Sequence, residues 1–184
     1  MSNRTGTYVA FDGLGQTDPT KSDFKYYATI QAWAANKNID FNLTNSHEKT
    51  YAVQDTSKLS TLHSRIQERL RVSKNMLVIL TEDTRYTGSV LSYEIEQALD
   101  NYKIPLVIAY PAYSSILDVN ALISFWPKAL NERINNPSTK AIHIAFNKDC
   151  ILDAITRFHV NSELLTNGKN HYSREAYVQW GLVK

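Results

Sequence analysis

The stretch that decides the fold class is Met76-Leu77-Val78-Ile79-Leu80, an unbroken apolar run near the middle of the chain. Such a run is typical of a strand buried on both faces, as in a parallel sheet with helices on each side. A second run of the same character spans residues 104–110, with Pro105 near its start. These two runs predict neighbouring inner strands of a parallel sheet.

Strand-like and helical patterns alternate on both sides of these runs. The clearest helical stripe is Leu59, Leu62, Ile66 and Leu70, which recur at spacings of three and four. Further strands are predicted at 7–11, 39–43 and 141–146, and further helices at 24–33, 89–101, 118–130 and 150–159. Five strands alternating with helices predict an α/β fold, with a doubly wound, mainly parallel sheet in the order 2-1-3-4-5.

The 184 residues suit one domain with a short tail. The alternating pattern predicts an α/β domain over residues 1–160. Residues 161–184 fall outside it and are predicted to be a C-terminal extension packed on the domain, in the form of a small hairpin. The aromatic residues Tyr172, Tyr177 and Trp180 favour this packing.

Charge and composition exclude several classes of protein. Lys and Arg number 20 against 18 Asp and Glu, a net charge of +2, which argues against nucleic acid or an anionic membrane as a partner. The single cysteine, Cys150, cannot form an internal disulfide and is interpreted as a core residue. No apolar run approaches the roughly 18 residues of a membrane span, and the N-terminus lacks the apolar core of a signal peptide. These features predict a cytoplasmic protein.

A ligand of such a sheet binds beyond the carboxyl ends of the strands, near the point where the strand order reverses. The loops at that edge are expected at residues 12–18, 45–55, 81–88 and 110–113. The site is therefore predicted among these loops and the helix that follows the third of them.

Glu94 is the unusual residue of that helix. It falls inside the apolar stripe, because Val90 lies four residues before it and Ala98 four residues after it. An inward carboxylate is costly unless another group satisfies it, and no Lys or Arg stands three or four residues away. Glu94 is thus either a buried structural partner or a residue of the site. The pattern alone leaves both open.

Three segments of the chain resemble TIR-like domains, in particular those of the Thoeris antiphage proteins of the ThsB type. They are TRYTGSVLSYEI (residues 84–95), YVAFD (8–12) and FNLTNSH (41–47). The resemblance covers roughly residues 6 to 160. It implies a flavodoxin-like fold and cleavage of NAD between nicotinamide and ribose, to give ADP-ribose or a cyclic or conjugated ADP-ribose signal. It makes Glu94 the catalytic residue, although Val90 stands where the family often has Trp.

The resemblance and the loop positions together predict the residues that contact substrate. NAD is then a substrate, and no cofactor is expected. No metal is expected either, because the histidines lack ligand spacing. Alternatives remain for several residues: Asp12 could cap the turn at Gly13, Ser89 could cap a helix, and His47 could contact a neighbouring subunit. The predicted substrate-binding residues are Phe11, Asp12, Asn45, His47, Thr81, Thr84 and Ser89.

Two other functions compete with NAD cleavage. The first is a non-catalytic TIR-like signalling module that self-associates through the loop 44–55, as a homo-oligomer. The second is a receiver-like phosphoacceptor, for which Asp12, Asp83 and Lys148 stand in loosely suitable places. The receiver pattern is weak, because Asp12 is followed by glycine and Asp83 lies beyond the expected end of its strand.

Overall fold

The computed structural model describes residues 4–15, 18, 20, 22–37, 41, 43–44 and 59–184. Within these residues the sheet has six strands, all parallel, in the order β2-β1-β3-β4-β5-β6. The predicted order of the first five strands is confirmed. The strands are β1 (Gly6–Ala10), β2 (Leu43–Thr44), β3 (Ser73–Ile79), β4 (Leu106–Tyr110), β5 (Ala141–Ala145) and β6 (Asn170–His171).

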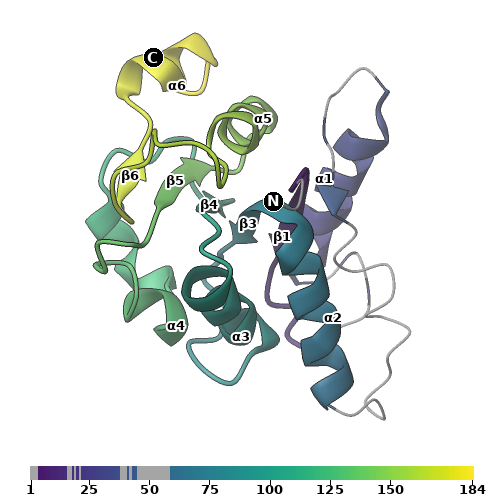
Figure 1. Ribbon diagram of the computed structural model, residues 1–184. Coiled ribbons are helices and arrows are strands. Elements are labelled where there is room, and N and C mark those ends of the chain that lie inside the picture. The colour runs from purple at the N-terminus through teal and green to yellow at the C-terminus, as the bar shows by residue number, and fades with distance from the viewer. Residues whose placement is uncertain are drawn as a thin grey trace.

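Helices cover both faces of the sheet (Figure 1). One face packs against α1 (Phe24–Ala35) and α5 (Lys148–Arg157), and the other against α2 (Leu59–Val72), α3 (Val90–Glu96) and α4 (Lys128–Asn131). Strand residues alternate between the two cores: Tyr8 of β1 points toward α2 and α3, and Val9 points toward α1 and α5. All residues of β4 are buried, as its apolar run predicted, and so are all residues of β5.

Two predicted helices differ from the structure in detail. The helix predicted over 89–101 is α-helical only in α3 and continues as the π-helical segment η1 (Gln97–Asn101). The helix predicted over 118–130 is instead the 3-10 helix η2 (Val119–Phe125) followed by the short α4. Pro127 separates them, because its ring disfavours helical backbone at Trp126 and supplies no N–H to the preceding turn.

The predicted C-terminal hairpin is wrong. β6 pairs in parallel with β5, at the register Ile142 to Asn170, and the chain then forms α6 (Arg174–Gln179). A hairpin would need a second, antiparallel strand, whereas the open edge of β5 already offers its backbone to an incoming parallel strand. Tyr172 and Tyr177 are buried in the same core as α5, and the Tyr172 hydroxyl donates to Asp153 at 2.5 Å. The domain boundary at residue 160 stays a prediction.

A buried polar network fastens this segment to the sheet. The Tyr110 hydroxyl donates to Nδ1 of His143 at 2.8 Å, and Nε2 of His143 donates to the Gly168 carbonyl at 2.9 Å. The Trp126 indole N–H in turn donates to the Tyr110 oxygen at 2.9 Å. Burial lowers the pKa of His143 to about 4, so the ring is neutral at physiological pH and can accept on one nitrogen while donating from the other.

Gly168 is the tightest point of this attachment. A Cβ at this residue would lie 2.2 Å from the carbonyl oxygen of Ile134, which is backbone and cannot move aside cheaply. We expect Gly168→Ala to lower the free energy of unfolding by about 1–3 kcal/mol or more. Urea denaturation followed by circular dichroism measures the change.

Gly181→Ala is the matched control. Gly181 has open space around it and a φ of 69°, so alanine there bears only the strain of the left-handed backbone, about 1 kcal/mol. A larger loss for Gly181→Ala than for Gly168→Ala would contradict the close approach as the cause.

Candidate functional site

The carboxyl ends of β1 and β3 are joined by the carboxylate of Asp12. The Arg85 guanidinium donates to it through Nε at 2.9 Å and Nη2 at 2.8 Å, and the Arg85 backbone N–H adds a bond of 3.0 Å. The backbone N–H of Leu14 donates to the same carboxylate at 3.0 Å. Burial alone would raise the pKa of Asp12, but these donors outweigh it and hold the pKa below its usual value. Asp12 is therefore an ionised clamp between two loops.

A second buried carboxylate, Asp23, lies close to this clamp. Thr81, just past β3, donates its hydroxyl to both Asp23 oxygens at 3.0 and 3.2 Å. Burial raises the pKa of Asp23 to about 6, because it outweighs the Thr81 bond, which lowers the pKa; the nearby charges of Asp12 and Asp83 act in the same direction as burial. Thr84 closes the same loop by accepting from the Thr81 N–H at 3.0 Å. This edge of the sheet thus concentrates negative charge, in part balanced by Arg85.

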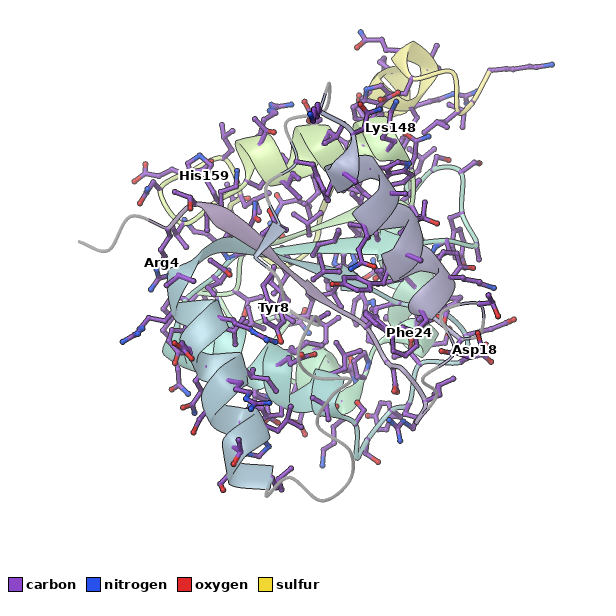
Figure 2. All side chains as sticks on the ribbon, turned by 90° about the vertical axis from the view of Figure 1, so that its right-hand side faces the viewer. Arg4, Tyr8, Asp18, Phe24, Lys148 and His159 are labelled. Carbon is purple, nitrogen blue, oxygen red and sulfur yellow. The ribbon has the colours of Figure 1, made fainter. Side chains whose placement is uncertain are left out.

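Glu94 lies on α3, on the face that packs against the sheet. Its helix begins at Ser89, whose hydroxyl oxygen accepts from the Ser92 N–H at 3.3 Å and so caps the first turn. The Glu94 side chain reaches β1, where the Tyr8 hydroxyl donates to Oε1 at 2.5 Å. Figure 2 shows Tyr8 on the side of the sheet that faces α2. Glu94 is only 3% exposed, so Tyr8 meets it inside the protein.

Burial dominates the electrostatics of this carboxyl group. Desolvation raises the pKa of Glu94 to about 8, more than the Tyr8 bond and the positive charge of Arg69 on α2 lower it. The negative charge of Asp12 raises it slightly further. The same burial, together with Glu94, raises the pKa of Tyr8 well above its usual value. A buried carboxyl group that titrates near neutral pH is a property of many acid–base and electrostatic catalysts.

The structure brings some of the predicted residues together and separates others. One loop cluster contains Asp12, Thr81 and Thr84. Asp12 also caps the turn at Gly13, which was the alternative interpretation of this residue, because it accepts from the Leu14 N–H. Ser89 caps the first turn of α3, which was the alternative interpretation of this residue. Phe11 faces the other core, where its ring stacks on Tyr27 at 5.3 Å. Asn45 and His47 lie outside the described residues, as does most of the loop 44–55.

Sequence reasoning missed three residues of this region: Tyr8, Asp23 and Arg85. Tyr8 carried a signal, because a hydroxyl in a strand buried on both faces needs a partner inside the protein. Arg85 stood in a loop expected at the ligand edge, but nothing local indicated Asp12 as its partner. Asp23 had no signal, since its environment depends on where the start of α1 meets the end of β3.

Other chemistry finds less support. Among the described residues, no group of three His, Cys, Asp or Glu side chains could hold a metal ion. Cys150 is fully buried, as interpreted, and burial raises the pKa of its thiol to about 12, which is unlike a nucleophile. In the receiver hypothesis Asp12 would have to bind a cation, yet four donors already surround its carboxylate.

The fold defines a class. A doubly wound parallel sheet with helices on both faces is a flavodoxin-like α/β fold, the fold of TIR-like domains. The family model described as "Thoeris protein ThsB, TIR-like domain" matches residues 8–116, more than half of the chain. The chain belongs to this family, and the match supports a TIR-like role in antiphage defence. Among the described residues, no helix has the length and apolar character needed to cross a membrane.

The raised pKa of Glu94 makes stability depend on pH. The folded protein keeps the Glu94 proton up to pH about 8, whereas the unfolded chain loses it near the ordinary value of 4.5. Stability from this group is therefore complete below 4.5 and declines as pH rises toward 8, by a few kcal/mol as an order of magnitude. Glu94→Gln keeps the shape and the acceptor for Tyr8 but cannot ionise, so it should escape this decline.

Urea denaturation of both proteins at several pH values between about 4.5 and 8 measures the difference. The raised pKa of Asp23 acts equally on both proteins and cancels in the comparison. Parallel stability profiles would show that the pKa of Glu94 is the same in the folded and unfolded protein, and would contradict this account of its burial.

Proposed function

We propose that this protein cleaves the bond between nicotinamide and ribose in NAD, with Glu94 as the catalytic residue. The observation that carries the proposal is the Glu94 carboxyl group itself: 3% exposed, on the inner face of α3, with a pKa of about 8. Membership of the ThsB TIR-like family and the resemblance of residues 84–95 to its helix signature support the same assignment.

The chemistry needs a carboxylate where positive charge develops. As the C–N bond breaks, nicotinamide leaves as a neutral molecule and the ribose becomes oxocarbenium-like. An ionised Glu94 stabilises that charge, in the way that carboxylates stabilise glycosyl cations in glycoside cleavage. Water then captures the ribose to give ADP-ribose and a proton, or a hydroxyl group of the same or another molecule captures it to give a cyclic or conjugated product.

Substrate binding itself favours the ionised form. The nicotinamide ring of NAD is a cation, and a cation beside a carboxyl group lowers its pKa. Glu94 is thus neutral and held by Tyr8 before NAD binds, and becomes ionised beside the nicotinamide. Because Tyr8 occupies one Glu94 oxygen at 2.5 Å, the nicotinamide ribose has to displace this contact or enter beside it.

The direct test is incubation with NAD, with nicotinamide and ADP-ribose products detected by mass spectrometry. Wild-type protein should release nicotinamide, and Glu94→Gln and Glu94→Ala should lower the rate by about a hundredfold or more. Glu94→Gln keeps the side-chain volume and the Tyr8 contact, so its loss of activity cannot come from misfolding.

Glu96→Gln is the matched control. Glu96 lies two residues further along α3, on the polar face, where its side chain is 42% exposed and 3.8 Å from Arg133. It should keep wild-type activity. Equal turnover in wild type, Glu94→Gln and Glu94→Ala would remove Glu94 from the reaction. If no condition, including extracts of phage-infected cells, elicits turnover, the non-catalytic self-associating module takes the place of this proposal.

Tyr8 is a positioning residue in this scheme. Its hydroxyl donates to Glu94 and lowers the pKa of that carboxyl group. Tyr8→Phe removes this bond, so the midpoint of the pH dependence of kcat/KM should move upward from about 8, and activity at neutral pH should fall. Tyr93→Phe is the control, because the Tyr93 hydroxyl accepts from Gln67 on α2 and is not bonded to Glu94. A midpoint that does not move in Tyr8→Phe would show that Tyr8 does not tune Glu94.

A further inference from the structure

A cavity of about 370 Å³ lies at the edge of the sheet opposite the candidate site. It opens where Pro105 leads into β4 and Lys140 leads into β5, at the amino ends of these strands. The loop cluster lies instead at the carboxyl ends of β1 and β3, and Glu94 contacts Tyr8 in the middle of β1. Figure 2 shows the separation: Arg4 and His159 lie at one end of the molecule, and Asp18 and Phe24 at the other.

The polar lining of this cavity is basic. Lys103, Lys140 and His159 line it, and none of its lining residues is a carboxylate. Within the described part of the chain, neither Lys103 nor Lys140 forms an ion pair. The nearby Asp100 is already neutralised by Arg133 at 2.9 Å. An uncompensated pair of ammonium groups around a concave surface attracts an anion.

Donors and charges surround the two lysines. The backbone N–H of Asn161 donates to Nδ1 of His159 at 3.2 Å, so the neutral ring carries its proton on Nε2 and can donate there. Ser162 accepts from the Leu164 N–H at 3.4 Å, which leaves its own hydroxyl proton for a further acceptor. Arg4 adds positive charge to this edge, since its Nη1 donates to the carbonyl of Tyr102 at 3.0 Å.

The backbone of Lys103, at the rim of this cavity, is strained. Its φ is 51°, in the left-handed region, directly after Tyr102, the C-cap residue of η1. Glycine adopts this backbone freely and is the usual residue just past a helix end, whereas a side chain is strained there. Strained backbone of this kind concentrates at ligand sites, where it holds a side chain in position.

The lining of the cavity is also partly apolar. Leu99, Ile104 and Val160 line it, beside the basic residues. The volume falls within the range of about 300–1,000 Å³ that is usual for small-molecule sites. A ligand that suits both kinds of lining residue carries a phosphate and a flat or apolar group.

We propose that this cavity binds a phosphorylated small molecule with an aromatic or apolar part, such as a mononucleotide, at a site separate from Glu94. The phosphate lies between Lys103 and Lys140, with His159 and Ser162 as further donors, and the aromatic part packs on Leu99 and Val160. Lysine suits this role because it offers a compact charge with rotatable donors for a phosphate.

The probe is adenosine monophosphate, titrated into the full chain by isothermal titration calorimetry, with adenosine and inorganic phosphate as partial ligands. Adenosine monophosphate should bind more tightly than either. Lys103→Glu and Lys140→Glu should each weaken it by about tenfold or more, since a charged hydrogen bond is lost and repulsion added. Lys148→Glu makes the same change of charge at the far end of α5 from His159 and should bind as wild type does (Figure 2).

Lys103→Gly separates a ligand role from a structural one. Glycine relieves the left-handed strain, so the melting temperature should rise or hold while the affinity for adenosine monophosphate falls. Glu94→Gln should bind adenosine monophosphate as wild type does, because Glu94 does not line this cavity.

Four results would overturn the proposal. They are no binding by the wild type, equal affinity for adenosine and its monophosphate, equal affinity for phosphate alone, and affinities that are the same in Lys103→Glu, Lys140→Glu and Lys148→Glu. The last result would place the bound nucleotide outside this cavity.

Discussion

The hydrogen bond from Tyr8 to Glu94 satisfies a carboxyl group that is buried between the sheet and a helix. The rest of the structure depends on the same constraint, which is the burial of the sheet on both faces. A strand such as β4, in which every residue is buried, leaves no place for an unpaired charge between sheet and helix. Glu94 is the carboxylic acid that enters this layer, and it is accommodated by a hydroxyl partner and by keeping its proton up to pH about 8. Burial of the Glu94 carboxyl group costs stability, and it also brings the pKa of this group close to neutral pH.

Because the interior disfavours unpaired charge, two separate groups of charged side chains lie at opposite edges of the sheet. The carboxyl edge holds the buried Asp12, which the Arg85 guanidinium binds, and the buried Asp23, which the Thr81 hydroxyl binds. The amino edge holds Lys103 and Lys140 around a cavity without carboxylates. A net charge of only +2 hides this separation. The separation of the two groups of charge allows one domain to carry two chemically different surfaces that do not interfere with each other.

The C-terminal segment supports this arrangement from the side of β5. The network of Tyr110, His143 and Trp126 places an uncharged hydrogen-bond relay in the core and ends on the Gly168 carbonyl. A relay whose members are all satisfied fixes the register of β6 without burying a charge. The residues around His159 and Ser162, which line the basic cavity, are held between α5 and this attachment.

The sequence by itself determined what depends on neighbours along the chain. Apolar runs and helical stripes indicated the first five strands, their order and the inward position of Glu94, because burial imposes periods of two and 3.6 on a local stretch. Only the tertiary structure decided the partners. Tyr8 is 86 residues from Glu94, Asp12 is 73 from Arg85, and Asp23 is 58 from Thr81. Such pairs arise from strand register and helix placement, which no local pattern records, and the turn of residues 161–184 into a parallel strand follows from the open edge of β5.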